Sequence, residues 1–422
     1  MLESQHPMER ARKVPASAER SYSVRLLAPN APLVDVLKQL VRSDERILVV
    51  TTPSVDKYYR SLFQELNHRG NAPIHILHVS ERSKSMDAVL EVCEKAAAER
   101  LGRKATFLSV GGGICSDITA MAASLYRRGV SQVRVPTTLL AQVDAAVGIK
   151  CAVNTGSKKS GLGLFSPPRE VVVDLSFLRT LDAGQLSAGF AEVLKIAIVC
   201  EKRLFETLEA NPSLMLPDCV AAAPESLGNV VWLSIGAMLE QLEPNLYEDK
   251  SLARFVDFGH TFSPAFETLS AYRVTHGQAV ALDISMCVVM SWRAGMLSAA
   301  DRDRILTLLG RAGLATFSPL VSLDVCLRGI EEAMRHRGGA VNLVVPTGVG
   351  NAIFISDIPF IEAMVRDSIR WLKRNADVEA RFAPLSCLLA ESNETSHATT
   401  RMTAINSIEN SERRQEARSN GQ

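Results

Sequence analysis

The sequence predicts an α/β domain with a parallel sheet, followed by an all-α domain. The chain has 422 residues, which is long enough for two domains with sizeable cores. From Tyr22 onward, β-like and helical segments alternate, as they do where helices connect parallel strands. Beyond Leu181 the segments become mainly helical, and the next β-like run comes at residues 341–345. The change in pattern therefore indicates two domains of different classes.

The elements of the first domain follow from apolar periodicity and from the glycine and polar residues that interrupt it. Strands are expected at residues 23–27, 47–51, 74–79, 107–110 and 133–135, and helices at 33–42, 55–67, 86–101 and 117–126. Residues 136–159 are rich in hydroxyl groups, carboxylates and cations that alternate with small residues. Such side chains make a poor core, so we interpret this segment as a loop that lines a ligand site.

The elements of the second domain are predicted from helical periodicity. Helices are expected at residues 188–209, 227–242, 260–270, 277–295, 299–312, 323–336 and 360–373. We place the α/β domain at residues 22–180 and the helical domain at 181–375. Residues 1–21 and 376–422 are polar and weakly periodic, and both are expected to be disordered tails.

Composition and charge limit the classes of partner. The formal net charge of +1 provides no basic field for nucleic acid or an anionic membrane, so we expect small-molecule partners. The amino end has no apolar signal-peptide core, and no apolar run reaches the roughly 18 residues of a membrane helix. The eight cysteines form no CxxC pair and fit buried, reduced thiols. A cytoplasmic protein is therefore expected.

A glycine turn joins the fourth predicted strand to the next helix. Gly111, Gly112 and Gly113 follow the apolar run 107–110 and precede the helix that contains Asp117. Without a Cβ, glycines let backbone N–H groups approach a phosphate, and the start of a helix favours the same anion. Three glycines also fit a simple tight turn, so this signal alone leaves both interpretations open.

A second candidate turn, residues 80–87, follows the predicted strand 74–79. Glu81 and Lys84 lie in it, at a place where ligands of open α/β sheets gather. By spacing alone, a solvated turn with a helix N-cap explains these residues better.

Three possible metal ligands lie in the helical half. Glu192 occurs in an apolar helical stretch, where a carboxylate is costly unless it is paired or bound to a metal. Lys195, three positions later, could pair with it on the same helix. His260 and His276 each stand beside a glycine and could be ordinary surface residues. Together, one carboxylate and two imidazoles match an open catalytic zinc site.

The motifs GGGxxxDxxxxxAxxxxRG, PTTLLAxxD, GxK and a VN turn followed by lysine occur in this order from Gly111 to Lys159. With these motifs the chain resembles the dehydroquinate synthase superfamily of sugar phosphate cyclases, from about Tyr22 to about Lys373. The resemblance implies a dinucleotide-binding α/β domain, an all-α metal-binding domain, and a homodimer. It also implies NAD and Zn²⁺, or Co²⁺, as cofactors.

The resemblance assigns roles to individual residues. It implies that NAD is bound by Glu81, Lys84, Gly112, Gly113, Asp117, Thr137, Thr138, Leu140, Asp144 and Lys159. It implies substrate contacts from Arg128, Lys150, Asn154, Lys159, Lys195, Arg254, Asp257, Pro264 and Asp283. The implied catalytic residues are Asp144, Lys150, Lys195 and His260, and the implied metal ligands are Glu192, His260 and His276. Arg128, Lys150 and Lys159 would face the phosphate, with Arg128 reaching across a dimer interface; a surface-charge role is the alternative for these three.

The family's chemistry accounts for this combination of sites. In the enzymes that the chain resembles, bound NAD oxidises a ring hydroxyl, and the new carbonyl acidifies the neighbouring C–H bond. Phosphate then leaves, NADH reduces the ketone again, and the opened sugar closes into a carbocycle by aldol addition. The cofactor is recycled in each turnover.

Departures from the dehydroquinate pattern indicate a different substrate. Met238 stands where those enzymes have a lysine, Arg254 is displaced by one residue, and Pro264 takes the place of a residue in their GHTxGH motif. A substrate carboxylate would lose charge-assisted hydrogen bonds of about 1.5–3 kcal/mol each. We therefore expect a substrate without a carboxylate.

The replacing motifs EPNLYE, VDFGHTFSP, HGxAVALD and RHRGG resemble the cyclases of sedoheptulose 7-phosphate, especially the 2-epi-5-epi-valiolone synthases. Asp257 and Asp283 would then bind sugar hydroxyls, with helix capping or pairing with arginine as the alternative. Ser160 replaces the usual asparagine of the family and leaves one phosphate or hydroxyl contact open.

Other functions remain as alternatives. A sister cyclase would make desmethyl-4-deoxygadusol, 2-epi-valiolone or dehydroquinate. A metal-dependent polyol dehydrogenase would share the architecture and release NADH. A nucleotide-binding regulatory protein is disfavoured, because Lys150, Glu192, Lys195, His260 and His276 are all present.

Overall fold

A computed structural model of the chain describes residues 21–28, 31–40, 46–67, 72–78, 80–156, 158–222 and 224–379. Two compact units divide the chain. The first contains the residues up to Ile196 together with Leu216–Val256, and the second contains Ala197–Met215 and the residues from Asp257 onward. The predicted domain limits at 22–180 and 181–375 stay a prediction.

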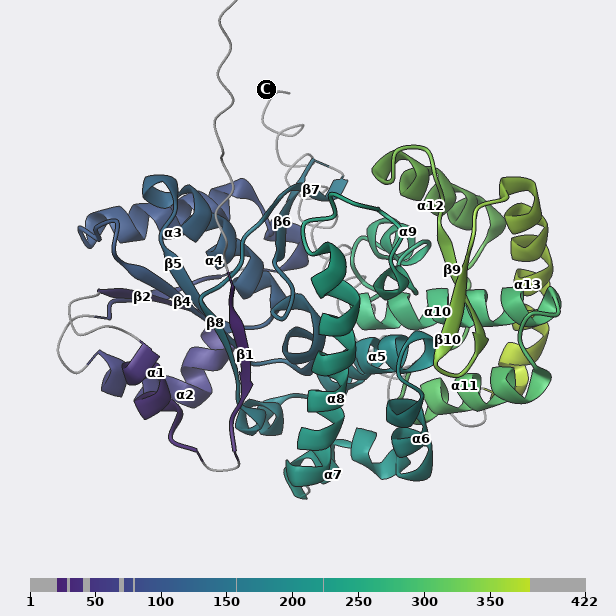
Figure 1. Ribbon diagram of the computed structural model, residues 1–422, viewed down its shortest axis with the longest axis horizontal. Coiled ribbons are helices and arrows are strands. Elements are labelled where there is room, and N and C mark those ends of the chain that lie inside the picture. Colours follow the sequence, from purple (N-terminus) through teal and green to yellow (C-terminus); the bar gives the residue numbers. More distant parts are fainter. Residues whose placement is uncertain are drawn as a thin grey trace, which may run out of the picture. The chain divides into compact units, whose positions relative to one another are not determined.

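The first unit is built on a six-stranded sheet (Figure 1). Its strands are β1 (Ser23–Leu26), β2 (Ile47–Thr51), β3 (Ile74–Ile76), β4 (Thr106–Gly111), β5 (Ser131–Pro136) and β8 (Glu170–Val173). They lie in the order β1-β8-β5-β4-β2-β3, and each neighbouring pair is parallel. The predicted parallel sheet is confirmed.

Helices cover both faces of this sheet. The helices α1 (Leu33–Leu40) and α2 (Pro53–Leu66) lie on one side, and α3 (Met86–Ala98) and α4 (Gly113–Leu125) on the other (Figure 1). Side chains of β2 alternate between the two cores: Val49 packs in one and Leu48 in the other, and both are fully buried. Burial on both faces explains why these strands are continuous apolar runs in the sequence.

The segment predicted as a loop contains regular structure. Residues Ala141–Ala145 form a π-helical turn (η3), and β6 (Lys150–Thr155) pairs with β7 (Lys158–Phe165) as an antiparallel hairpin. The loop prediction was wrong here because Gly161 and Gly163 lower the strand propensity of β7, while pairing with β6 supplies the missing stabilisation. The first unit also contains α7 (Pro217–Ala222) and α8 (Pro224–Leu242).

The described residues of the second unit are helical apart from one hairpin. Its helices are α6 (Lys202–Ala210), α9 (Ser263–Leu269), α10 (His276–Arg293), α11 (Ala299–Arg311), α12 (Leu323–His336) and α13 (Ile358–Glu379). The strands β9 (Leu343–Gly348) and β10 (Asn351–Ile355) pair antiparallel. The predicted fold class, an α/β domain followed by a helical domain, is confirmed, with this hairpin as an addition.

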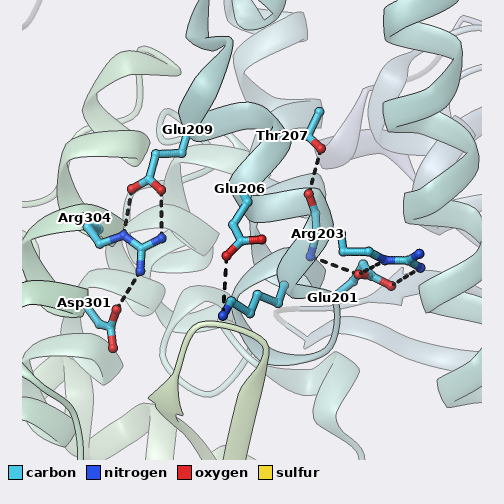
Figure 2. Close-up of polar contacts among 8 residues, drawn as sticks. Glu201, Arg203, Glu206, Thr207, Glu209, Asp301 and Arg304 are labelled. Carbon is cyan, nitrogen blue, oxygen red and sulfur yellow. Dashed lines mark hydrogen bonds and ion pairs between the residues drawn. The ribbon is translucent and has the colours of Figure 1, made fainter.

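One predicted helix, 188–209, is two helices in the structure, α5 (Ala183–Val199) and α6. Glu201 caps α6, and its carboxylate accepts a hydrogen bond from Arg203 N at 3.0 Å. Arg304 of α11 donates to both carboxylate oxygens of Glu209 at 2.8 Å and also binds Asp301 (Figure 2). These contacts hold α6 against α11 within the second unit.

The predicted disordered tails can be compared with the structure only in part. Helix α13 continues to Glu379, so residues 376–379 of the predicted tail 376–422 are helical, and the prediction was wrong for them because the helix runs on past the periodic apolar residues that predict it. The remainder of that tail, residues 380–422, and residues 1–20 of the predicted tail 1–21 lie outside the described residues. Among the helices of the described residues, none is long and apolar enough to cross a membrane. The described cysteines are reduced thiols, as predicted, but only Cys115, Cys151, Cys287 and Cys326 of them are buried, and Cys93, Cys200 and Cys219 are half-buried.

Candidate active site

The glycine turn lies at the carboxyl end of β4, where α4 begins. A Cβ atom on Gly112 would lie 3.2 Å from Thr138 Cγ2, and one on Gly113 would lie 3.1 Å from Ala145 Cβ. Segment 137–145 therefore packs directly against the turn, and larger residues would push it away. The first turn of α4 carries no acidic side chain, so its N–H groups are suited to a phosphate.

A buried ion pair lies beside this turn. Lys84 is 6% exposed, and its ammonium group pairs with the carboxylate of Asp117 on α4. Burial raises the pKa of Asp117, and Lys84 limits that rise. Burial opposes the charge on Lys84, but Asp117 and Glu81 outweigh it and raise its pKa. The predicted NAD residues Glu81, Lys84 and Asp117 are thus brought together within the first unit.

Asn154 connects the β6–β7 hairpin to the same turn. Its side-chain amide donates to the backbone oxygen of Glu81 at 2.8 Å and to Glu81 Oε1 at 3.1 Å. Its backbone N–H donates to Lys84 O at 2.8 Å, and its Oδ1 accepts from Ser160 N at 2.8 Å. Ser160 has a left-handed φ of 51°. Asn154, predicted to contact substrate, therefore has protein partners that fix the turn and the hairpin together.

A three-residue charge cluster lies between α5 and η3. Lys195 is 2% exposed, and its Nζ lies 2.6 Å from Asp144 Oδ2 and 2.5 Å from Glu192 Oε2. Burial, and then the charge of Glu192, raise the pKa of Asp144 to about 6. Burial opposes the charge on Lys195, but the two carboxylates outweigh it and raise its pKa. The helical pairing of Glu192 with Lys195 is present, and a carboxylate titrating near neutral pH is suited to proton transfer.

The predicted phosphate cations lie at three places in the first unit. Lys150 begins β6 and pairs with Glu248, and Arg254 pairs with the same carboxylate oxygen. Lys159 is half-buried on β7. Arg128 is exposed at the end of the 3₁₀ turn Tyr126–Arg128. Glu248 was missed by sequence reasoning, although it ends the EPNLYE motif.

The two histidines of the second unit have fixed ring orientations. His260 Nδ1 lies 3.0 Å from Phe258 O, and His276 Nδ1 lies 2.9 Å from Glu267 Oε1. The ring centroids of the histidines are 5.3 Å apart. His276 is the first residue of α10, and His260 precedes α9 by three positions, outside the helix predicted to contain it. The histidines are therefore close neighbours within one unit, whereas Glu192 belongs to the other.

The remaining predicted substrate residues have structural partners in the second unit. Asp283 Oδ2 accepts hydrogen bonds from Phe262 N at 2.6 Å and from Ser263 N at 2.9 Å, at the start of α9. Asp257 Oδ2 lies 3.3 Å from Arg337 Nη2. The alternatives of helix capping for Asp283 and arginine pairing for Asp257 are thus the arrangements observed. Pro264 occupies the first turn of α9.

Comparison with known proteins adds to this geometry. The family models described as 3-dehydroquinate synthase N-terminal and C-terminal match residues 74–188 and 189–335. A 2-epi-5-epi-valiolone synthase from Streptomyces albus is 35% identical over 81% of this chain and 86% of that protein. A 3-dehydroquinate synthase from Synechococcus sp. is 34% identical over 75% of this chain and 86% of that protein.

A solved structure extends the comparison to the fold. ValA (2-epi-5-epi-valiolone synthase) from Streptomyces hygroscopicus subsp. jinggangensis 5008, with NAD⁺ and Zn²⁺ bound, is 33% identical with a TM-score of 0.77. The match covers 85% of this chain and 99% of that one. Fold, motifs and relatives together define an enzyme of the sugar phosphate cyclase class. The chain belongs to the 3-dehydroquinate synthase family, so the resemblance drawn from its motifs is confirmed.

Proposed function

We propose that this enzyme converts sedoheptulose 7-phosphate to 2-epi-5-epi-valiolone with loss of phosphate. One observation carries the choice of substrate. Where the dehydroquinate synthases have two cationic side chains for a carboxylate, this chain has one apolar side chain and one cation that is already paired. Met238 is buried in α8, 2% exposed, and Arg254 is already paired with Glu248. A substrate carboxylate would lose charge-assisted hydrogen bonds there, whereas a neutral hydroxymethyl end would not. The valiolone synthases among the relatives support the same choice, although identity alone does not separate them from dehydroquinate synthases.

NAD is proposed to bind in the first unit, where the glycine turn, the Lys84–Asp117 pair and segment 137–145 adjoin. The residues proposed to hold it are Glu81, Lys84, Gly112, Gly113, Asp117, Thr137, Thr138, Leu140, Asp144 and Lys159. The glycine turn fits a bound dinucleotide, because side chains at Gly112 or Gly113 would occupy the space beside the first N–H groups of α4. When bound, NAD would accept a hydride and return it to the same substrate.

Zn²⁺, or Co²⁺, is proposed to bind to Glu192, His260 and His276. One carboxylate and two imidazoles are a donor set of open catalytic zinc sites. The second unit fits this role, because the Nδ1 atom of each histidine faces an oxygen acceptor. A metal there would polarise an oxygen of the substrate.

Proton transfer is proposed to use Asp144 and Lys195. Their Oδ2 and Nζ atoms are 2.6 Å apart, and the raised pKa of Lys195 keeps its ammonium group protonated, so Lys195 would orient the Asp144 carboxylate that takes up the proton. Asp144, with its pKa raised to about 6, is ionised at neutral pH and can accept a proton from a substrate hydroxyl. His260 is the further proposed catalytic residue.

The phosphate is proposed to be held by Lys150, Lys159 and Arg128. Lys150 stands opposite Phe165 at the open end of the hairpin, where it also pairs with Glu248, and Lys159 lies near the turn, so the proposal requires each lysine to reach the phosphate from its own end. Arg128 is exposed, and we propose that it is supplied by the second subunit of a cytoplasmic homodimer.

The test is a side-by-side assay of phosphate release with sedoheptulose 7-phosphate and with the carboxylated precursor of dehydroquinate. We expect turnover of the first substrate only, with 2-epi-5-epi-valiolone identified by mass spectrometry and by comparison with standards of its isomers. Substoichiometric NAD should restore activity to cofactor-free protein. Turnover of the carboxylated sugar alone would contradict the proposal, and stoichiometric accumulation of NADH would indicate a dehydrogenase.

A further inference from the structure

Glu267 is a buried carboxylate that contacts one of the proposed metal ligands. It lies on α9 next to the fully buried Phe266, and it is 2% exposed. Its Oε1 atom is 2.9 Å from His276 Nδ1, while the His276 side chain remains 31% exposed. A carboxylate at this depth is costly unless it makes strong hydrogen bonds, so the contact with His276 requires an explanation.

The surrounding backbone fixes both partners. Tyr272 N donates to Glu267 O at 2.8 Å, and Ser270 Oγ donates to the same oxygen at 2.9 Å, which closes the turn after α9. Thr275 and Gln278 form a capping box at the start of α10, where His276 is the first residue. Asp283 of α10 binds the two N–H groups at the other end of α9. Asp283 thus joins α10 to the start of α9, and the Glu267–His276 contact joins the two helices near the end of α9.

The contact determines which nitrogen of His276 can bind a metal. When Glu267 is ionised, its carboxylate only accepts hydrogen bonds, so the contact then puts the proton of His276 on Nδ1 and leaves the lone pair on Nε2. The backbone oxygen of Phe258 has the same effect on His260, because a carbonyl oxygen cannot donate. Both rings therefore present Nε2 as the ligand nitrogen.

We propose that Glu267 is a positioning residue of the metal site, which sets the tautomer and orientation of His276 and strengthens its bond to the metal. The inference rests on the proposed metal ligands Glu192, His260 and His276, and it adds a fourth protein group that does not touch the metal. Outer carboxylates of this kind raise ligand basicity, and their loss typically weakens metal affinity 10- to 100-fold.

The test compares Glu267→Gln with Glu209→Gln in the full-length protein. Glu209 is a matched control: it lies in the same unit, it is partly buried, and it pairs with Arg304 away from the histidines. Zinc affinity is measured by competition with a chelator, without substrate or NAD. We expect the dissociation constant for zinc to rise about 10- to 100-fold in Glu267→Gln and to stay unchanged in Glu209→Gln. Glu267→Asp, which keeps the charge, should recover part of the affinity.

A second measurement does not depend on metal. Nitrogen chemical shifts of ¹⁵N-labelled histidine in metal-free protein should show His276 protonated on Nδ1 in the wild type, and a mixture of tautomers in Glu267→Gln. Wild-type zinc affinity and tautomer in Glu267→Gln would overturn the inference and leave the proposed function intact. If the wild-type protein and His276→Ala bind zinc equally poorly, the proposed metal site fails and this inference fails with it.

Discussion

At the scale of single residues, several carboxylates of this protein are buried and held by polar or charged partners. Glu192, Glu267 and Asp283 are each at most 2% exposed, and each has a defined partner: an ammonium group, an imidazole and backbone N–H groups. Sequence reasoning found Glu192 from the cost of a carboxylate in an apolar helix. Glu267 also follows an apolar residue, the buried Phe266. The sequence of one short helix does not show which of its sides is buried, so the cost of burying Glu267 could not be recognised.

Asp283 makes a pH dependence of stability testable. Burial raises its pKa from 3.8 to about 6, and the N–H groups of Ser263 and Phe262 only partly offset this. Because the pKa is higher in the folded state, the folded protein binds more protons between about pH 4 and pH 6. The contribution of Asp283 to stability is therefore present below pH 4 and is lost as the pH rises through 6, by an amount on the order of 2–3 kcal/mol.

We expect Asp283→Asn to remove this contribution, because an amide does not titrate. Melting temperatures of metal-free protein measured from pH 4 to pH 7 should therefore change with a different slope in Asp283→Asn than in the wild type. The exposed Asp324 provides the control, since Asp324→Asn should keep the wild-type slope. Parallel curves for the wild type and Asp283→Asn would contradict this assignment.

At the scale of elements, α5 positions the charge cluster by close packing. A Cβ atom on Gly189 would lie 2.4 Å from Leu139 Cβ and 2.8 Å from Leu140 N, so the helix approaches the backbone of segment 137–140 directly. By contrast, Gly236 in α8 has no atom within 4 Å of an added Cβ. Two helical glycines in the same unit thus stand in opposite environments.

We expect Gly189→Ala to lower stability by more than about 1–3 kcal/mol, the usual cost of overpacking, because backbone must move. Gly236→Ala should instead raise stability by about 0.5–1 kcal/mol, since alanine is the better helix former. Thermal unfolding measures both, and NAD affinity should fall only in Gly189→Ala. An unchanged melting temperature in Gly189→Ala would show that α5 does not pack this closely.

The elements also show how far the sequence predicts the fold. The parallel sheet, its four helices and most helices of the second unit follow from periodicity, because each buries a continuous apolar face. The break between α5 and α6 does not, since no proline or glycine marks it. It depends on Glu201 capping α6 and on Gly350 N, which donates to Ile198 O at 2.8 Å, a contact across about 150 residues of sequence. The β6–β7 hairpin likewise depends on pairing that local propensity does not reveal.

The candidate site was predictable to a similar degree. The motifs led to Lys84, Asp117, Asp144 and Lys195, and the structure brings these together as two ion pairs. The sequence did not reveal that Asp283 and Asp257 face protein partners, because both alternatives place a carboxylate in apolar surroundings. Only the geometry of α9 and Arg337 distinguishes them.

At the scale of the whole molecule, the proposed metal takes one ligand from the first unit and two from the second. A ligand that binds only the folded state adds RT ln(1 + [L]/Kd) to stability, which is about 2.7 kcal/mol at a free concentration of 100 Kd. Zinc should therefore stabilise the folded protein.

We expect zinc to raise the melting temperature of wild-type protein and chelators to reverse the increase. Glu192→Gln should lose most of the increase, because a neutral amide is a poor zinc ligand, whereas Glu209→Gln should retain it. Differential scanning calorimetry with and without zinc measures both effects. An equal increase in Glu192→Gln would place the metal on the second unit alone.

The turn that carries Arg128 has a consequence for laboratory evolution of this enzyme. Arg127, Arg128 and Gly129 have consecutive left-handed φ angles of 50°, 65° and 113°. Such angles cost a residue with a Cβ about 1–2 kcal/mol, which glycine would not incur. Arg127 has a structural use, because its Nε donates to Leu101 O at 3.0 Å. Selection for thermostability alone should therefore favour glycine at position 128. If Arg128 holds the phosphate as proposed, selection for turnover should restore arginine, so the two screens should select different residues at this position.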